Sequence, residues 1–303
     1  MTDWVLRVTS LNQWRRGGER APHKPLLLLY SLGRLQRTGS SVMAFADVER
    51  DLDALLEEFG PPRRTNPGYP FHHLVSDGLW IVRTPSGIGS PGPNRAELRA
   101  RALGELEPEF ARAVELSPQL FASVVHALLD SNFESTLHQD ILDRVGISLA
   151  PVETGETTPL VHGARRRDPR FRDLVLVAYE YRCAACGYDG GLGHEAVGIE
   201  AAHVRWWAAN GPDELANGVA LCSLHHKLFD SGAIGLTTDH KVTVSSRFIG
   251  RSSAAEQLVL ALVGKPLVRP QSGHAPPAAQ HVSWHETQVF RGPARRASAL
   301  EFA

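Results

Sequence analysis

Apolar residues recur at helical spacing in the first part of the chain and predict two helices there. Asp3 is a favourable N-cap residue for the first helix, whose apolar residues are Trp4, Val8, Leu11 and Trp14. A second helix begins near Pro25, which suits a first helical turn. The leucines at positions 26–29 make this helix apolar on every face, so we expect it to be buried.

Three further elements follow before residue 150. The alternating segment 69–84, with the turn pair Asp77-Gly78 at its centre, predicts a β-hairpin. Ser117 and Pro118 predict a helix N-terminus, as cap and first helical residue. A last helix of this region is expected to end at Gly146.

A change of composition divides the chain. Residues 150–164 are rich in Pro, Thr and Gly, which is typical of a linker. The following segment, 165–182, carries six arginines and predicts a helix. Its expected apolar face consists of Phe171, Leu174, Val175, Ala178 and Tyr179. Near the C-terminus, residues 282–290 predict a strand or a helix that packs back onto the second domain.

Composition favours an ordinary globular protein. The chain has 303 residues, 43% of them apolar and 21% charged, which suits two domains with separate cores. The net charge of −1 excludes a polycation, so nucleic acid would have to bind through local patches. No apolar run is long enough for a membrane span, and the amphipathic start does not resemble a signal peptide. We therefore expect a cytoplasmic protein.

The three cysteines form part of a candidate zinc site. Cys183 and Cys186 make a C-x₂-C pair, and Cys222 and His225 make a C-x₂-H pair. Three thiolates and one imidazole are a closed tetrahedral set for structural zinc. The alternative is a chance C-x₂-C with buried, inert thiols. The second pair in the same spacing favours zinc and uses every cysteine of the chain.

A second constellation lies between the two pairs. His203 ends a predicted strand, Asn217 stands in an Asn-Gly turn, and His226 follows on a predicted helix. Asp230 is one helical turn after His226, on the same face. This order predicts a β-hairpin followed by a helix, with a catalytic metal bound between them.

From Cys183 to residue 235 the sequence resembles the HNH nuclease family of the ββα-metal fold, through "EAAH", "NG" and "H-x₃-D". The resemblance implies that His203 is the general base, that Asn217 orients it, and that His226 and Asp230 bind Mg²⁺ or Mn²⁺. Many members carry a metal ligand directly before the base, where this chain has Ala202. Glu200, on the same strand face, either binds the metal or braces the fold.

The first 150 residues resemble the sulfur-binding domain of phosphorothioate-dependent HNH restriction enzymes. The resemblance rests on "HKPLLLL", "GYPFHH…DGLW" and "TLHQDILDRVG". It implies an apolar wall for the sulfur, basic contacts to the modified strand, and further contacts to the backbone and bases. By position these residues are Tyr69 and Pro70, then His23 and Lys24, and then Arg95 and His73. The alternative is a plain turn at Tyr69 and a capping segment at His23.

These patterns predict an α+β protein: a helical and β-hairpin sulfur-binding domain at 1–150, a linker at 151–164, and a zinc-stabilised HNH domain at 165–303. The predicted function is a type IV restriction endonuclease that binds phosphorothioated double-stranded DNA and cuts nearby, as a homodimer. Three other interpretations stay open: an HNH enzyme that recognises methylated bases, a non-catalytic zinc protein that binds DNA, and an unspecific repair or homing nuclease.

Overall fold

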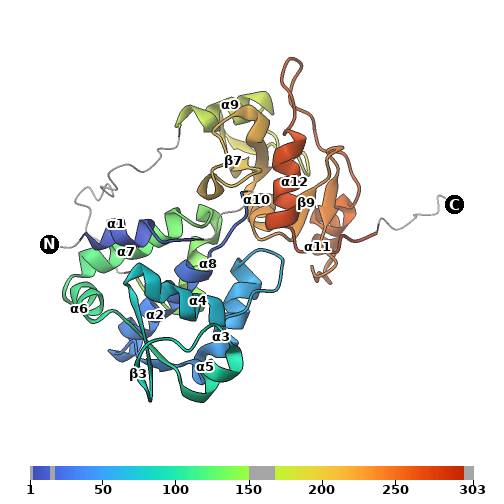
Figure 1. Cartoon of the computed structure of the whole chain (residues 1–303). Helices are drawn as coiled ribbons and strands as arrows, with labels where there is room; N and C mark the ends of the chain where they lie inside the picture. The colour runs from blue at the N-terminus through green and yellow to red at the C-terminus, as the bar shows by residue number, and fades with distance from the viewer. Residues whose placement is uncertain (1–2, 14–17, 150–167, 297–303) are drawn as a thin grey trace. The chain divides into compact units, whose positions relative to one another are not determined.

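The structure is a computed structural model that describes residues 3–13, 18–149 and 168–296. The chain divides into two compact units, the first ending at residue 164 and the second beginning at 165 (Figure 1). The predicted linker at 151–164, Trp14 and the arginines at 165–167 lie outside the described residues. Within the described ranges, no helix combines the length and the apolar character that a membrane span needs.

The first unit is mainly helical and contains one small sheet. Its α-helices are α1 (Trp4–Thr9), α2 (His23–Thr38), α3 (Phe45–Phe59), α4 (Gly68–His73), α5 (Arg95–Arg101), α6 (Pro108–Leu116), α7 (Pro118–Asp130) and α8 (His138–Val145), with 3₁₀ turns η1 (Leu74–Asp77) and η2 (Ser135–Leu137). The antiparallel sheet has the order β1 (Met43–Ala44), β4 (Leu103–Leu106), β2 (Trp80–Thr84), β3 (Gly87–Ile88).

The helix start predicted at Asp3, the start at Ser117 and the end at Gly146 are confirmed, but the first helix is shorter than expected, because α1 ends at Thr9 and Leu11 lies beyond it. The Asp3 side chain accepts a hydrogen bond from the backbone N–H of Leu6, and Ser117 accepts one from that of Leu120. Gly146 ends α8 with a left-handed backbone, φ 69°, that glycine adopts without steric cost. The leucines at 26–29 of α2 are at most 1% exposed, so this helix is the centre of the first core.

The hairpin predicted at 69–84 is wrong in its first half. Residues 68–77 form α4 and η1, and only β2 is a strand. Phe71 and Leu74 are three residues apart, so a helix can bury both, and both are fully buried. The Trp80 indole N–H then donates to the Phe71 carbonyl at 3.0 Å, which fixes the helix against the strand. Gly78 does adopt φ 67°, but it ends η1 instead of joining two strands.

The second unit is built around a two-stranded antiparallel ribbon. β7 (Ile199–His203) pairs with β8 (Gly218–Cys222) so that His203 lies opposite Gly218 and Ile199 opposite Cys222. α9 (Arg170–Ala178) and α10 (Ser223–Asp230) both contact this ribbon. The other elements are β5 (Gly191–Leu192), β6 (Glu195–Ala196), η3 (Trp207–Ala209), η4 (Leu215–Asn217), β9 (Ile234–Leu236), β10 (Val242–Val244), α11 (Ser253–Leu258), η5 (Leu260–Leu262) and α12 (Ala279–Gln288).

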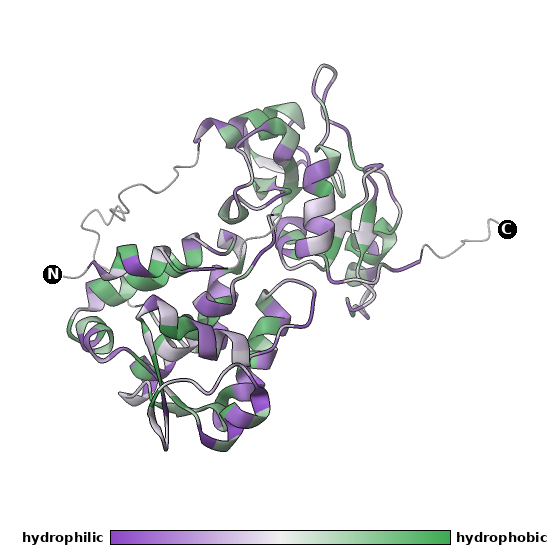
Figure 2. Ribbon diagram, in the orientation of Figure 1, coloured by the Kyte–Doolittle hydropathy of each residue, from purple (hydrophilic) through white to green (hydrophobic). Residues whose placement is uncertain are grey.

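Two helices of this unit, α9 and α12, can be compared with the elements predicted for their segments. In α9, Leu174 is 52% exposed, whereas Leu176 is buried, so the predicted apolar face was wrong at that position. The C-terminal segment is the helix α12, which Figure 2 shows mostly in hydrophilic and neutral colours. It nevertheless buries His281 and His285, and the His285 ring stacks on Phe229 of α10 at 3.7 Å.

Candidate active site and binding cavity

The three cysteines and His225 meet in one cluster. One ligand atom from each of Cys183, Cys186, Cys222 and His225 lies within 4.8 Å of all the others. The Nδ1 atom of His225 points to the sulfurs, 3.1 Å from Cys222 and 3.5 Å from Cys183. Its Nε2 atom is 2.7 Å from the Leu258 carbonyl, the outer contact that typically orients a zinc-bound histidine.

The electrostatics of this cluster also suit a cation. Hydrogen bonds from Cys186 and Cys222 lower the pKa of the Cys183 thiol, which favours a thiolate. Burial lowers the pKa of His225, but Cys183 and Cys222 outweigh burial and raise the pKa to about 10. Thiolates that attract a proton so strongly also attract a metal, which would displace that proton. The donor set and its outer contact therefore fit a structural zinc ion.

His203, at the end of β7, contacts Asp213 and Phe171. Its Nε2 atom is 2.8 Å from Oδ1 of Asp213, and both side chains are nearly buried, 5% and 11% exposed. The imidazole also stacks on the Phe171 ring of α9, with centroids 4.0 Å apart and planes 13° apart. The contact with Asp213 was not predicted from the sequence.

Asn217 is fully buried and closes the loop between the two strands. Its side-chain oxygen accepts from the backbone N–H of Arg205 at 2.8 Å. Its amide nitrogen donates to the carbonyls of Arg205 at 2.9 Å and Pro212 at 3.0 Å. Asn217 therefore fixes both ends of the loop that follows His203.

His226 lies between two carboxylates. Its Nδ1 atom is 2.6 Å from Glu200, and its Nε2 atom is 3.2 Å from Oδ2 of Asp230. Burial lowers the pKa of His226, but Asp230 and Glu200 raise it to about 10. Two neighbouring ligands of an octahedral Mg²⁺ ion are about 3 Å apart, so Nε2 and Asp230 fit one such ion. Glu200 holds the opposite nitrogen and also accepts from the Ser223 hydroxyl at 2.6 Å.

A cavity of about 540 Å³ opens on the first unit and gathers most of the predicted binding residues. His23, Lys24, Tyr69, Pro70 and His73 all line it. The other residues of its wall were not predicted from the sequence; they are Asn12, Gln13, Ala21, Arg63, Arg64, Thr65 and Ser76.

At this cavity Lys24 has an ion-pair partner, and His23 is partly buried. The Lys24 ammonium is 2.6 Å from the Asp77 carboxylate and 2.7 Å from the Asn12 carbonyl, and the pair is nearly buried. Burial lowers the pKa of His23 to about 4, so this ring is neutral at pH 7. Arg63 and Arg64 also line the cavity, and both are exposed.

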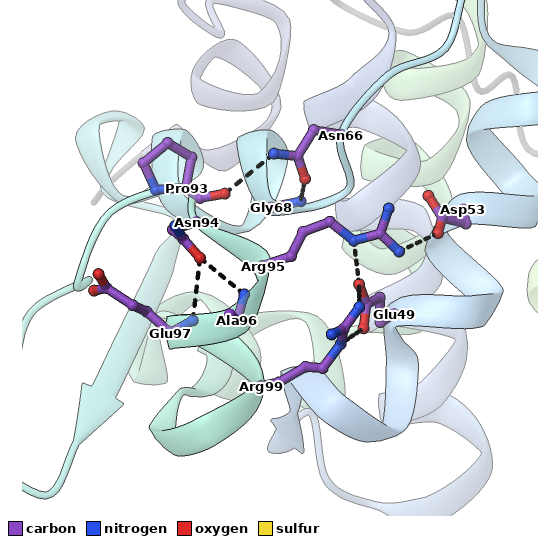
Figure 3. A network of polar contacts seen from close by, with 10 residues as sticks. All are labelled: Glu49, Asp53, Asn66, Gly68, Pro93, Asn94, Arg95, Ala96, Glu97 and Arg99. Atoms are coloured by element: carbon purple, nitrogen blue, oxygen red, sulfur yellow. Dashed lines mark hydrogen bonds and ion pairs between the residues drawn. The ribbon is translucent and has the colours of Figure 1, made fainter.

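Arg95 does not line this cavity; it belongs to the ion-pair network in Figure 3. Its guanidinium contacts Glu49 and, at 2.6 Å, Asp53 of α3, while Arg99 contacts Glu49 as well. Glu49 is buried, and its hydrogen bond from Arg99 holds the pKa of that carboxyl below its usual range. This network ties α5 to α3.

The same figure shows how α4 is fixed at its start. The Asn66 side chain donates to the Pro93 carbonyl at 3.2 Å and accepts from the Gly68 N–H at 2.9 Å. A β-carbon on Gly68 would lie 2.4 Å from the Pro93 oxygen, so only glycine allows this close approach. The helix that carries Tyr69 and Pro70 is thus anchored to the segment before α5.

Several solved structures are similar to parts of the chain. The structure of the sulfur binding domain of SprMcrA complexed with phosphorothioated DNA is 28% identical, covering 48% of this chain and 92% of that one, with a TM-score of 0.41. The ScoMcrA sulfur binding domain with such DNA is 23% identical, covering 48% and 96%, with a TM-score of 0.40. The modification dependent TagI restriction endonuclease is 23% identical, covering 41% and 38%, with a TM-score of 0.30. No curated protein matches the chain.

Two family models match the chain, one in each unit. The model described as "ScoMcrA-like, DNA sulfur-binding domain" matches residues 2–150, and the model described as "HNH endonuclease" matches residues 183–237. The chain carries a ScoMcrA-like DNA sulfur-binding domain and an HNH endonuclease domain. The HNH domain makes it a nuclease, and the mixed helix and strand structure confirms the predicted α+β class.

Two groups of candidate functional residues in these domains were not predicted from the sequence. In the HNH domain, Asp213 precedes Asn217 by only four residues, yet it has no motif of its own. In the sulfur-binding domain, the pair Arg63-Arg64 is a visible basic signal before "NPGYP". Because these arginines lie only a few residues before Tyr69 and Pro70, the sequence could have indicated them as further binding residues.

Replacing Asp77 by alanine is expected to destabilise the sulfur-binding domain by about 3 kcal/mol, because the buried Lys24 ammonium loses its partner. Asp77 also accepts from the Asn12 backbone N–H at 2.7 Å, so the segment after α1 loses an anchor. Urea unfolding monitored by tryptophan fluorescence measures the change. Asp47→Ala on the exposed face of α3 is the control, and equal midpoints for both variants would contradict the prediction.

Proposed function

We propose that this chain is a type IV, modification-dependent restriction endonuclease. It binds phosphorothioated double-stranded DNA through residues 1–150 and hydrolyses phosphodiester bonds nearby through residues 165–303. The observation that carries the proposal is the combination of the two family matches with an HNH ribbon on which His203, Asn217 and His226 all have structural partners.

The cavity of the first unit supplies the proposed sulfur site. Tyr69 and Pro70 present apolar surface there, and Tyr69 is 49% exposed. A non-bridging sulfur is larger and less hydrated than oxygen, so apolar contact favours the modified phosphate. His23 contributes a neutral ring, and its Nε2 atom is 3.1 Å from the Thr65 hydroxyl. His73 also lines the cavity and is exposed, and we assign it the base contacts.

Arg63 and Arg64 are the proposed contacts to the DNA backbone. Arg63 is 43% exposed and pairs with Glu19 at the surface, a type of pair that is readily exchanged for a phosphate. Lys24 supports the cavity through Asp77, and Arg95 supports α5 through Glu49. The proposal therefore assigns the two arginines the charge contacts that the sequence analysis gave to Lys24 and Arg95.

Arg64→Ala is expected to weaken binding of every duplex and to reduce the slope of log K against log salt concentration by about 1. The reason is that one phosphate contact is lost, together with the counterion that it releases. Fluorescence anisotropy at several salt concentrations measures the slope. Arg112→Ala, an exposed arginine on α6, is the matched control. An unchanged slope for Arg64→Ala would remove this residue from the interface.

The HNH domain supplies the proposed chemistry. His203 accepts the proton of the attacking water, and Asn217 keeps the loop closed around it. His226 and Asp230 would hold a divalent cation, Mg²⁺ or Mn²⁺, which when bound neutralises charge on the scissile phosphate and the leaving 3′-oxygen. Glu200 fixes the His226 ring through Nδ1 in this proposal and is an outer contact, not a ligand.

The zinc cluster and the assembly complete the proposal. Cys183, Cys186, Cys222 and His225 bind structural zinc. Cleavage of both strands near a symmetric site suits a homodimer. A nuclease that screens DNA for a modification acts in the cytoplasm and associates with the nucleoid when bound.

The decisive experiment is cleavage of one duplex with and without a single phosphorothioate, in Mg²⁺ and in Mn²⁺. We expect cleavage of the modified duplex and little or none of the plain one. A 5-methylcytosine duplex is included, since selective cleavage of that substrate would support recognition of methylated bases instead. Equal cleavage of all three would refute any modification-dependent function.

A further inference from the structure

We propose that Asp213 is a positioning residue for the general base: it fixes the tautomer and orientation of His203. This inference rests on the proposed nuclease function and adds a residue outside the His, Asn and His of the motif. Its basis is the hydrogen bond between Asp213 and His203 together with the contacts that hold Asp213 itself.

The contact between Asp213 and His203 is shielded from water. The Asp213 Oδ1 atom lies 2.8 Å from Nε2 of His203, and the two side chains are 11% and 5% exposed. The Phe171 ring covers one face of the imidazole. A hydrogen bond between such shielded groups keeps one geometry and is stronger than the same bond in water.

Asp213 is in turn held from both sides. Its second oxygen accepts from the backbone N–H of Asp168 at 2.9 Å. The preceding residue, Pro212, has its carbonyl fixed by the Asn217 amide at 3.0 Å. Gly211 has no room for a side chain, because a β-carbon would lie 1.8 Å from the Arg205 carbonyl oxygen. These contacts restrict the conformation of residues 211–213 and hold the Asp213 carboxylate beside His203.

This arrangement gives Asn217 a second role in the reaction. It does not bond the His203 side chain in the structure, yet it fixes Pro212 and thereby the residue that does. The asparagine of the motif thus acts on the histidine through Asp213. A loop without this amide would leave Asp213 free to turn away.

The chemistry follows from the hydrogen-bonding capacity of each group. An ionised carboxylate only accepts, so Nε2 of His203 carries the hydrogen and Nδ1 is the basic nitrogen. The attacking water gives one proton to Nδ1 while its oxygen bonds to phosphorus. The bond from phosphorus to the 3′-oxygen breaks, and the electron pair leaves on that oxygen. The Asp213 carboxylate stabilises the imidazolium that has formed.

Asp213→Asn tests the inference with little change of shape. The amide can donate to Nε2, which moves the imidazole hydrogen to Nδ1 and removes the base. Where a carboxylate orients a catalytic histidine, this exchange lowers kcat by up to about 10⁴-fold. We expect a loss of about 10²- to 10⁴-fold in kcat on phosphorothioated DNA, with KM unchanged. Asp239→Asn, an exposed aspartate beside Lys241, is the matched control.

A second measurement needs no substrate. The ¹⁵N shifts of the His203 ring, assigned by their loss in His203→Ala, report which nitrogen carries the hydrogen. We expect the Nε2–H form in the unchanged protein and the Nδ1–H form in Asp213→Asn. If the unchanged protein cuts no DNA, the proposed function fails while these shifts still decide the role of Asp213. A kcat within threefold of normal, or the same tautomer in both proteins, overturns the inference.

Discussion

His203→Ala is expected to lower cleavage of phosphorothioated DNA by about 10²- to 10⁴-fold while binding of the same DNA stays unchanged. Proton abstraction by a positioned side chain contributes about 10²- to 10⁴-fold, and the alanine has no group that can replace it. The binding cavity lies in the first unit and does not include this residue. Single-turnover cleavage and anisotropy, measured on one duplex, separate the two effects.

His194→Ala provides the control for this experiment, since its imidazole is exposed in the same unit. A non-catalytic zinc protein would lose nothing measurable in His203→Ala, because DNA binding would be its only activity. Full cleavage by His203→Ala would show that another group is the base. Loss of binding together with cleavage would show that the two units do not act separately.

The sequence predicted the parts of the HNH domain that depend on residues close along the chain. Strand β7 ends at His203 and helix α10 carries His226 and Asp230 four residues apart, as the spacing indicated. The adjacent histidines also diverge as expected. His225 points to the sulfurs, whereas His226 points to Asp230 and Glu200.

Contacts that depend on tertiary structure were not predictable in the same way. Asp213 reaches His203 only because Asn217 and Gly211 close the loop between them. The Lys24 ammonium pairs with Asp77, 53 residues away, a contact that no local pattern of the sequence indicates. The segment before β2 is helical because Phe71 and Leu74 find partners across the fold, which alternation of apolar residues did not reveal.

His225→Ala is expected to remove the zinc and to destabilise the second unit by about 5 kcal/mol or more. Structural zinc contributes on the order of 10 kcal/mol to the folding of small zinc domains, and this unit has an additional apolar core. The cluster joins Cys183 and Cys186, after α9, to the start of α10, so its loss frees the helix that carries His226 and Asp230. We expect the midpoint temperature of thermal unfolding to fall by about 15 °C. Calorimetry measures this midpoint, and the zinc content is determined on the same sample.

His226→Ala is the matched variant, because it removes the neighbouring imidazole and leaves the zinc ligands in place. It should keep one zinc per chain and a nearly normal transition but lose cleavage, since Asp230 alone would hold the catalytic cation weakly. Substitution of two adjacent histidines would thus have different effects: His225→Ala would lose zinc and stability, whereas His226→Ala would lose cleavage. A normal zinc content and transition in His225→Ala would contradict the zinc assignment. Equal loss of stability in both variants would mean that α10 is held by both sites together, and not by the zinc cluster alone.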